Sequence, residues 1–448
     1  MGKFFSILTA AFFAVAPLAA QADVLHGQEQ VFNIAVENTS LYSISLWVPF
    51  GSIADSKPGI AHVLEHLKFK TSDGKGFDAF NAVAGSNANA QTDYQSTRYD
   101  LNVPPDGLEE ALRSLAKIIT PLKITDADLA TEKAIVKQEL FQRTQADPDT
   151  PFYLDFYSRL FKGLPFERYP GATPTEIDNV TMKDVLDFDA AHYQNSSFLL
   201  QISGPYLNNS QMAVLKTLFP KAAYGQLLVN AQMRTKHLDA DLMALPPLVP
   251  ALPTPKVEPS KFAMQKKSDR VRSPKLTWSK IVTAPTPWRA VVASSVLGDA
   301  MRSRLAEGLH DKIADDAGLV QNWDVRVRRV SEDLWQIQFS ASLQPGVKPE
   351  DVQSILESYL AGLAKSGLSN ASFERLKKRK FLLSEWENVD GRIRSLGEDM
   401  TDFGLKKASG FRQELESLTV DDVNQLMVAL QQPGRLGFAL LTPQGGAQ

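Results

Sequence analysis

The feature of this sequence that most constrains its fold is an order of elements that occurs twice. A proline opens a helical pattern, a second helix follows, a threonine then starts a third helix, and an apolar strand comes next. The repeated segments are Pro105–Ile119, Asp126–Arg143, the helix from Thr181 and Phe198–Ser203 in the first half, and Pro349–Leu363, Asn370–Trp386, the helix from Thr419 and Leu436–Leu441 in the second. The repeat predicts an α+β fold of two structurally similar domains, each a mostly antiparallel sheet packed with helices. Two unrelated α+β domains are the alternative.

Further strands are expected where each half opens. Phe32–Ala35 and Leu41–Val48 have hairpin-like patterning in the first half, and Leu334–Leu343 has it in the second. Between the halves, repeated prolines from Leu245 to Pro255 exclude a long helix and favour an extended spacer. We therefore expect an N-terminal domain at 23–237, a proline-rich linker at 238–260 and a C-terminal domain at 261–448.

The first 22 residues have the pattern of a secretory signal peptide. Lys3 precedes an apolar stretch from Phe4 to Ala20, and Ala20-Gln21-Ala22 is a typical cleavage pattern, so Asp23 is the expected first mature residue. A membrane anchor is the alternative, but the apolar core is short. No later run reaches the roughly 18 apolar residues that a membrane span needs. We expect a secreted protein without a membrane span in the mature chain, periplasmic if the source is a Gram-negative bacterium.

Charge and cysteine content exclude several classes of protein. The 448 residues include 48 Lys and Arg and 51 Asp and Glu, and the net charge of −3 argues against a protein that binds nucleic-acid phosphates. Because the chain has no cysteine, it has no disulfide framework, thiolate nucleophile or Cys-ligated zinc site. Any metal must therefore be held by carboxylates and by the six histidines.

One short segment combines two of these histidines with a glutamate. Residues 59–67 contain the pattern H-x-x-E-H, formed by His62, Glu65 and His66. On a helix, residues four apart share a face, so the two imidazoles can bind one ion. Glu65 lies on much the same face and suits a base that acts on a water molecule at the metal. Two exposed histidines beside a glutamate are the alternative interpretation.

A catalytic zinc ion takes three protein ligands and keeps one open position, so a third ligand must come from elsewhere in the chain. Glu132 and Glu139 lie two turns apart on one side of a predicted helix. One of them could bind the metal while the other hydrogen-bonds a histidine ligand. A solvated helix face is the alternative for either residue.

The order of several motifs resembles that of the pitrilysin/insulinase-type metallopeptidases, which carry an inverted zinc motif. The matching segments are Gly59–His66, Ala84–Thr92, Thr97–Tyr99 and Glu132–Glu139. In size the chain is most similar to the two-domain group that includes mitochondrial processing peptidase and bacterial secreted relatives. This resemblance implies a zinc peptidase whose two domains form half of a clamshell.

The resemblance also assigns roles within the predicted site. It implies one Zn²⁺ per chain, held by His62, His66 and Glu139. Glu65 is implied as the general base, and Glu132 as the carboxylate that supports a ligand.

A strand edge after a turn at Gly85 is expected to bind the substrate. In the family, the equivalent edge pairs with the backbone of the peptide, and here it implicates Asn89, Ala90 and Thr92. Backbone pairing reads few side chains, so short or unfolded peptides are the expected substrates. For Asn89, an ordinary turn residue is the alternative.

The second half resembles the family's second domain but lacks a metal motif. Where active relatives often carry an Arg and a Tyr that hold the substrate carbonyl, this sequence has His310 and Gln321. A homodimer, or a heterodimer with a related chain that lacks the zinc motif and supplies the Arg/Tyr pair, is one explanation. Substitution by His310, Arg326 or Arg328 is the other.

Three classes of function therefore stay open. The first is a zinc metalloendopeptidase that cleaves peptides or unfolded polypeptides. The second is a catalytically impaired member of the family, acting as a non-enzymatic subunit or peptide-binding partner. The third is a hydrolase of some non-peptide amide, since zinc-assisted attack by water is general chemistry.

Overall fold

The chain is built around two sheets, each packed with helices. The computed structural model describes residues 29–36, 39–69, 78–81, 86–194, 197–229, 247–249, 255–304, 307–315, 317–386 and 389–444. The predicted signal peptide at 1–22 and the turn at Gly85 lie outside the described residues, as does most of the predicted linker. In the part of the chain that the structure describes, none of the helices combines the length and apolar character required to cross a bilayer.

The first sheet has six strands in the order β3-β4-β2-β5-β1-β6. Its strands are β1 Glu29–Val36, β2 Tyr42–Val48, β3 Asn87–Thr92, β4 Thr97–Val103, β5 Phe198–Gly204 and β6 Ala223–Val229. The helices around it are α1 Ile60–Phe69, α2 Asp78–Asn81, α3 Leu108–Ile118, α4 Asp126–Thr144, α5 Thr150–Leu160, α6 Pro174–Ile177, α7 Met182–His192 and α8 Asn209–Leu218, with 3₁₀ turns η2 Ser52–Ala54 and η3 Pro105–Gly107. β3 forms one edge, where its residues are alternately exposed and half-buried.

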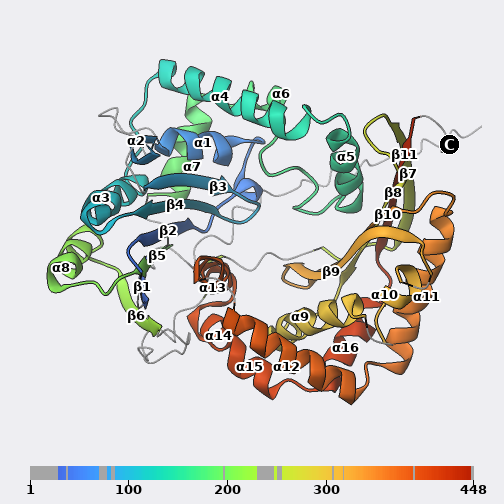
Figure 1. The fold of residues 1–448 in the computed structure, drawn as a ribbon. Helices are drawn as coiled ribbons and strands as arrows, with labels where there is room; N and C mark the ends of the chain where they lie inside the picture. Colours follow the sequence, from blue (N-terminus) through green and yellow to red (C-terminus); the bar gives the residue numbers. More distant parts are fainter. Residues whose placement is uncertain are drawn as a thin grey trace, which may run out of the picture.

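The second sheet has five strands in the order β7-β11-β8-β10-β9. Its strands are β7 Ser260–Ser268, β8 Lys275–Thr283, β9 Val320–Ser331, β10 Leu334–Leu343 and β11 Arg435–Pro443. The helices of this half are α9 Trp288–Arg302, α10 His310–Ile313, α11 Pro349–Ser366, α12 Asn370–Trp386, α13 Val389–Phe403, α14 Leu405–Ser409, α15 Phe411–Ser417 and α16 Val420–Leu430. Figure 1 shows the two halves facing one another.

The repeat seen in the sequence is present in the structure. The order β9-β10-β8-β11-β7 reproduces β3-β4-β2-β5-β1, and β6 is an addition to the first sheet. Thr181 and Thr419 begin the equivalent helices α7 and α16, and each forms a capping box with an aspartate three residues later. In both sheets most neighbouring strands are antiparallel, while β1 is parallel to β5 and β6, and β7 is parallel to β11. The predicted α+β fold of two similar domains is confirmed.

Two details of the predicted strands are wrong. β1 and β2 do not form a hairpin, because β5 lies between them, parallel to β1 and antiparallel to β2. The residues of β5 are buried on both faces of the sheet, which favours a central position with a neighbour on each side. Leu334–Leu343 does form a hairpin with β9, but it is the counterpart of β4, and β7 and β8 open the second half.

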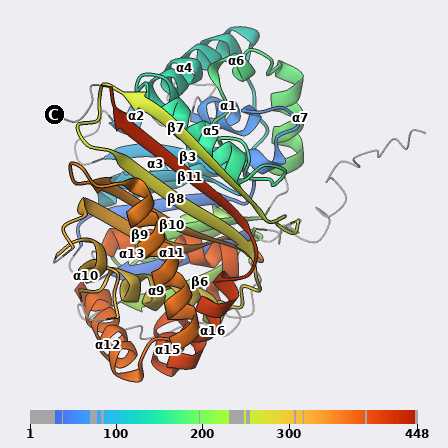
Figure 2. The same cartoon turned by 90° about the vertical axis from the view of Figure 1, so that its right-hand side faces the viewer.

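Each sheet is covered on one face by helices of its own half and on the other by a helix of the opposite half. On the second sheet α5 supplies this cover, and its Phe156 packs against Phe262 with ring centroids 5.5 Å apart. On the first sheet the counterpart is α13, whose Met400 shares a core with Trp47. Gly397 brings α13 close, since an added Cβ would lie 3.0 Å from the Trp47 ring. Figures 1 and 2 show this reciprocal packing, which places the two halves across a shared cavity.

The acidic residues of α13 make this interface sensitive to pH. Burial raises the pKa of Asp399 to about 7, helped by the charges of Asp402 and Glu398 and opposed by Arg329. Because an unfolded aspartate titrates near 3.9, the folded chain binds more protons than the unfolded chain between about pH 4 and pH 7. The contribution of Asp399 to stability therefore falls as the pH rises through this window.

We expect Asp399→Asn to raise the apparent melting temperature more at pH 8 than at pH 5, because asparagine carries no buried charge at either pH. Thermal unfolding followed by circular dichroism at the two pH values checks this. Asp421→Asn, an exposed change on α16, is the control. An equal or larger gain at pH 5 would contradict the assignment.

Candidate metal centre

The helix α1 carries the H-x-x-E-H segment and is held on all sides. Ile60, Val63, Leu64 and Leu67 are completely buried in the core of the first half, as expected from their pattern. α1 packs against α4, α7 and β3. At its start, Asp55 accepts hydrogen bonds from the backbone N–H groups of residues 59 and 61, at 2.8 Å each. These contacts fix the direction in which the polar face of α1 points.

Three side chains converge next to this face. His62 and His66 lie with ring centroids 5.1 Å apart, and Glu139 of α4 reaches both rings. The Nε2 atom of His66 lies 3.1 Å from Oε2 of Glu139, and the Nε2 atom of His62 lies 3.7 Å from Oε1 of the same carboxylate. Within the described residues, these three form a group whose ligand atoms all lie within 4.8 Å of one another.

The separations in this group fit a zinc ion. Two ligand atoms bound tetrahedrally at about 2.1 Å lie roughly 3.4 Å apart, and the two distances from Glu139 to the imidazoles fall on either side of that value. Two imidazole nitrogens and one carboxylate form the donor set of a catalytic zinc site with one position left for solvent or substrate. The predicted ligands His62, His66 and Glu139 are therefore brought together.

The other ring nitrogens face hydrogen-bond acceptors. Nδ1 of His62 lies 3.4 Å from the carbonyl oxygen of Gly171, and Nδ1 of His66 lies 3.3 Å from Oε2 of Glu132. An acceptor at Nδ1 keeps the proton there, which leaves the Nε2 lone pair free to bind a metal. Glu132 thus lies at the outer nitrogen of His66, and its supporting role stays a prediction.

Gly171 is a site residue that the sequence analysis missed. An added Cβ at this position would lie 2.9 Å from the Leu140 side chain and 3.4 Å from Nδ1 of His62. A side chain here would require Leu140 and Tyr169 to shift, so glycine suits the close approach of this carbonyl to the buried imidazole. No signal in the sequence marks this loop, because its contact with α1 arises only from the tertiary fold.

Without a metal, the imidazoles and the carboxylates around them stabilise one another's charged forms. Burial lowers the pKa of His66, but the hydrogen bonds to Glu132 and Glu139 outweigh it and raise the pKa to about 9. The bonds from both imidazoles hold the pKa of Glu139 far below its usual value. Arg143, one turn along α4, adds an ion pair to Oε1 of Glu139 at 2.6 Å. Glu139 is therefore ionised and available as a candidate ligand.

Glu65 lies beside this group without belonging to it. Its side chain is buried, which raises its pKa, while the His62 charge and a hydrogen bond from Thr92 oppose the shift. The Thr92 hydroxyl donates to Oε2 of Glu65 at 2.6 Å. A buried carboxylate with raised proton affinity, next to two histidines, has the properties of a general base.

The predicted substrate-binding residues lie on β3, at the sheet edge expected for them. β3 pairs only with β4 among the described strands, so its outer edge can take an added strand beyond Ala88, whose N–H already donates to Oδ1 of Asn81 at 2.8 Å. Asn89 is exposed and Ala90 is half-buried. The side chain of Thr92 is instead directed to Glu65. Substrate binding at these three positions stays a prediction.

A cavity of about 970 Å³ lies between the two halves, close to this edge. Gln91, Tyr94, Tyr157, Ala172 and Arg328 are among the residues that line it, whereas the three residues of the metal group do not line it. Its walls come from β3, α5 and β9, so elements of both halves face the same space.

Three residues of the second half were considered as replacements for the Arg/Tyr pair of the family. Of these, Arg328 lines the cavity. Arg326 pairs with Asp324 and is exposed. His310 lies on α10 outside the cavity lining, with Nδ1 3.3 Å from Asp315. Together with Asp311 these two form another His/Asp group, but both of its carboxylates are exposed.

Comparisons with known proteins find peptidases that are similar to this chain. The family described as "Insulinase (Peptidase family M16)" matches residues 31–154, and "Peptidase M16 inactive domain" matches residues 179–380. The "Zinc protease PqqE" of Helicobacter pylori is 25% identical over 363 residues, 78% of this chain and 75% of the relative. The "Uncharacterized zinc protease ML0855" of Mycobacterium leprae is 24% identical over 410 residues, 90% of this chain and 86% of the relative.

Solved structures show the same fold. A protease from Helicobacter pylori superposes with a TM-score of 0.73 at 21% identity, covering 94% of this chain and 98% of that one. The first half of the periplasmic protease PqqL from Escherichia coli gives a TM-score of 0.72 at 14% identity, covering 94% and 92%.

Proposed function

The chain belongs to the insulinase family of peptidases, family M16, and on that premise we propose that it is a zinc-dependent peptidase. The observation that carries the proposal is the convergence of two imidazoles on one carboxylate, with distances of 3.1 and 3.7 Å. His62, His66 and Glu139 would hold the ion. When bound, zinc would supply Lewis acidity and lower the pKa of a water molecule, so that the water can lose a proton and attack a carbonyl near neutral pH.

The residues of the chain perform the remaining steps. Glu65 accepts the proton of the attacking water and returns it to the leaving amine. Glu132 keeps the ring of His66 in place through Nδ1. A peptide adds as a strand to the open edge of β3, near Asn89 and Ala90, and extends into the cavity. Backbone pairing favours extended or unfolded substrates over folded proteins.

The second half contributes a positive charge to the same space. We propose Arg328 of β9 as the group that faces the substrate carbonyl, because it lines the cavity and no tyrosine or arginine occupies the expected positions at residues 310 and 321. A homodimer or a related partner chain that supplies the Arg/Tyr pair is the competing proposal. Secretion, with cleavage after Ala22, is proposed from the N-terminal pattern alone.

Activity of the single purified chain tests the proposed function. We expect residues 23–448 to contain zinc by elemental analysis and to cleave an internally quenched, unstructured peptide. A chelator should remove the activity, and added zinc should restore it, because the ion supplies the Lewis acid. If the zinc-loaded chain cleaved no peptide alone or with a related chain, the peptidase proposal would fail and a peptide-binding role would replace it.

A further inference from the structure

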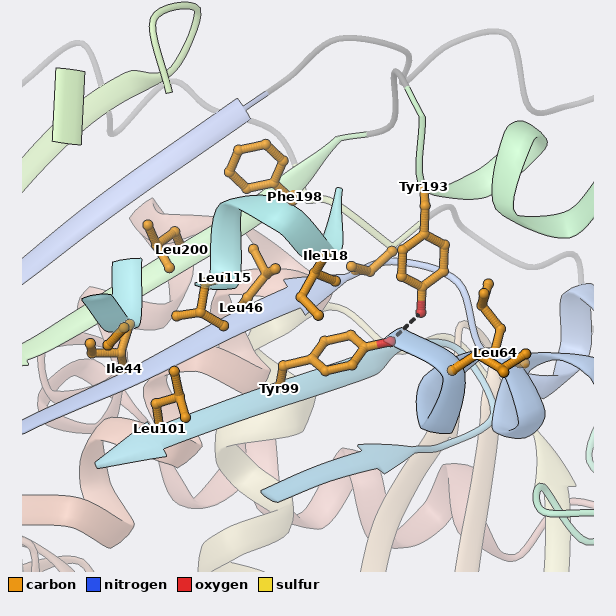
Figure 3. Close-up of a cluster of buried hydrophobic side chains, with 14 of the residues drawn as sticks. Ile44, Leu46, Leu64, Tyr99, Leu101, Leu115, Ile118, Tyr193, Phe198 and Leu200 are labelled. Atoms are coloured by element: carbon orange, nitrogen blue, oxygen red, sulfur yellow. Dashed lines mark hydrogen bonds between the residues drawn. The ribbon is translucent and has the colours of Figure 1, made fainter. Parts of the chain in front are cut away.

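A row of hydroxyl groups leads from Glu65 into the core of the first half. Thr92 donates to Glu65 at 2.6 Å, and its hydroxyl lies 3.4 Å from that of Thr97. Thr97 also interacts with the phenol of Tyr193, which in turn lies 3.0 Å from the phenol of Tyr99. Figure 3 shows the Tyr99–Tyr193 hydrogen bond, with apolar side chains around it.

The direction of these contacts follows from proton counting. A hydroxyl has one proton, and the proton of Thr92 is committed to the Glu65 carboxylate, so Thr97 is the donor where the two threonines meet. Thr97 also donates to the carbonyl of Phe50 at 3.0 Å, so its proton is shared between two acceptors. The row therefore connects Glu65 with the buried phenols through Thr92 and Thr97, and Thr97 shares its one proton among its neighbours.

Strand pairing and burial hold the residues of this row in place. Thr92 and Thr97 are directly opposed in the β3–β4 ladder, and the side chains of Thr97, Tyr99 and Tyr193 are almost completely buried. Burial raises the pKa of both tyrosines, and the nearby Glu65 charge contributes to the same shift, so the phenols remain protonated donors. A buried hydroxyl is costly unless it is bonded, which restrains each group to its partner.

The geometry points to a hydroxyl chain that positions the Glu65 carboxylate for its role in the proposed reaction, and this inference rests on the proposed function. The hydroxyl chain consists of Thr92, Thr97, Tyr193 and Tyr99. Its members touch neither metal nor substrate and act through Glu65, so they are positioning residues. Phenylalanine would fill the core at both tyrosine positions, whereas the phenols extend a bonded row to the base. Thr92 makes the direct contact and carries the largest share.

Kinetics of hydroxyl-deleting variants test the hydroxyl chain. Thr92→Val, which keeps the β-branched shape, should lower kcat about 10²-fold, as expected when a reacting group is misplaced, with little change in KM or zinc content. Thr92→Ser should retain most of kcat because it keeps the donor. Tyr193→Phe and Tyr99→Phe should give smaller losses, in that order. Tyr359→Phe deletes a phenol bonded to the Glu307 carbonyl in the second half, and it should leave kcat unchanged.

A readout that is independent of turnover is the position of the base. In a crystal structure of metal-free Thr92→Val, the Glu65 carboxylate should leave its place while His62, His66 and Glu139 stay. Wild-type kcat in Thr92→Val, or an undisturbed Glu65, would overturn the inference. An equal loss of kcat in Thr92→Ser would also overturn it. Serine keeps the hydroxyl, so such a loss would mean that Thr92 acts through its packing and not through its hydrogen bond. Failure of the wild-type chain to cleave peptides is a different result and rejects the proposed function itself.

Discussion

The Glu65→Gln variant should keep its zinc and lose turnover by roughly 10²- to 10⁴-fold, the usual contribution of general acid–base catalysis. Glutamine has nearly the same shape and can still accept the Thr92 hydrogen bond that Glu65 receives at 2.6 Å. It cannot take a proton from water. Because Glu65 lies outside the group of ligand atoms, the affinity for the metal should change little.

Zinc content and steady-state cleavage of a quenched peptide, measured on the same preparation, check this prediction. The matched control is Glu109→Gln on the exposed face of α3, where the glutamate forms a surface ion pair with Arg113. That change should leave both quantities as in the wild type. Cleavage at the wild-type rate by Glu65→Gln would show that another group is the base.

Local periodicity was enough to predict which side chains of α1 share the face of the candidate metal site. His62, Glu65 and His66 are close in the chain, and helical geometry alone places them on one face. Glu132 and Glu139 could be placed on one side of a helix, but spacing alone left open which of them binds the metal. The structure separates them by partner: Glu139 lies between the two Nε2 atoms, and Glu132 lies on Nδ1 of His66.

Contacts between distant segments could not be predicted in the same way. The carbonyl of Gly171 reaches His62 across more than a hundred residues of sequence. The hydrogen bond from Thr92 to Glu65 was not foreseen, because the direction of the Thr92 side chain depends on how β3 pairs with β4. The insertion of β5 between β1 and β2 likewise depends on burial of β5 from both faces. Short-range patterns carry no information on such choices.

Replacing Glu139 should weaken the binding of zinc, whereas replacing Glu65 should leave it nearly unchanged. Glu139→Gln removes the one carboxylate of the group, and the remaining two imidazoles are a weak site for a divalent ion. We expect the affinity for zinc to fall by more than the about 10- to 100-fold that follows the loss of an outer partner. Activity at limiting zinc should fall with it.

Glu132→Gln supplies the graded comparison on the same helix. It can still accept from Nδ1 of His66 through its amide oxygen but loses the charge, so its effect should stay within the range of an outer partner. Zinc titration against a competing chelator measures both variants, and the rise in melting temperature on adding zinc gives a second reading, since a ligand stabilises only the state that binds it. Equal zinc affinities for wild type and Glu139→Gln would show that Glu139 is not a metal ligand. The convergence of Glu139 on both imidazoles would then be an ordinary ion pair, and with it the chemical basis for hydrolysis would be lost.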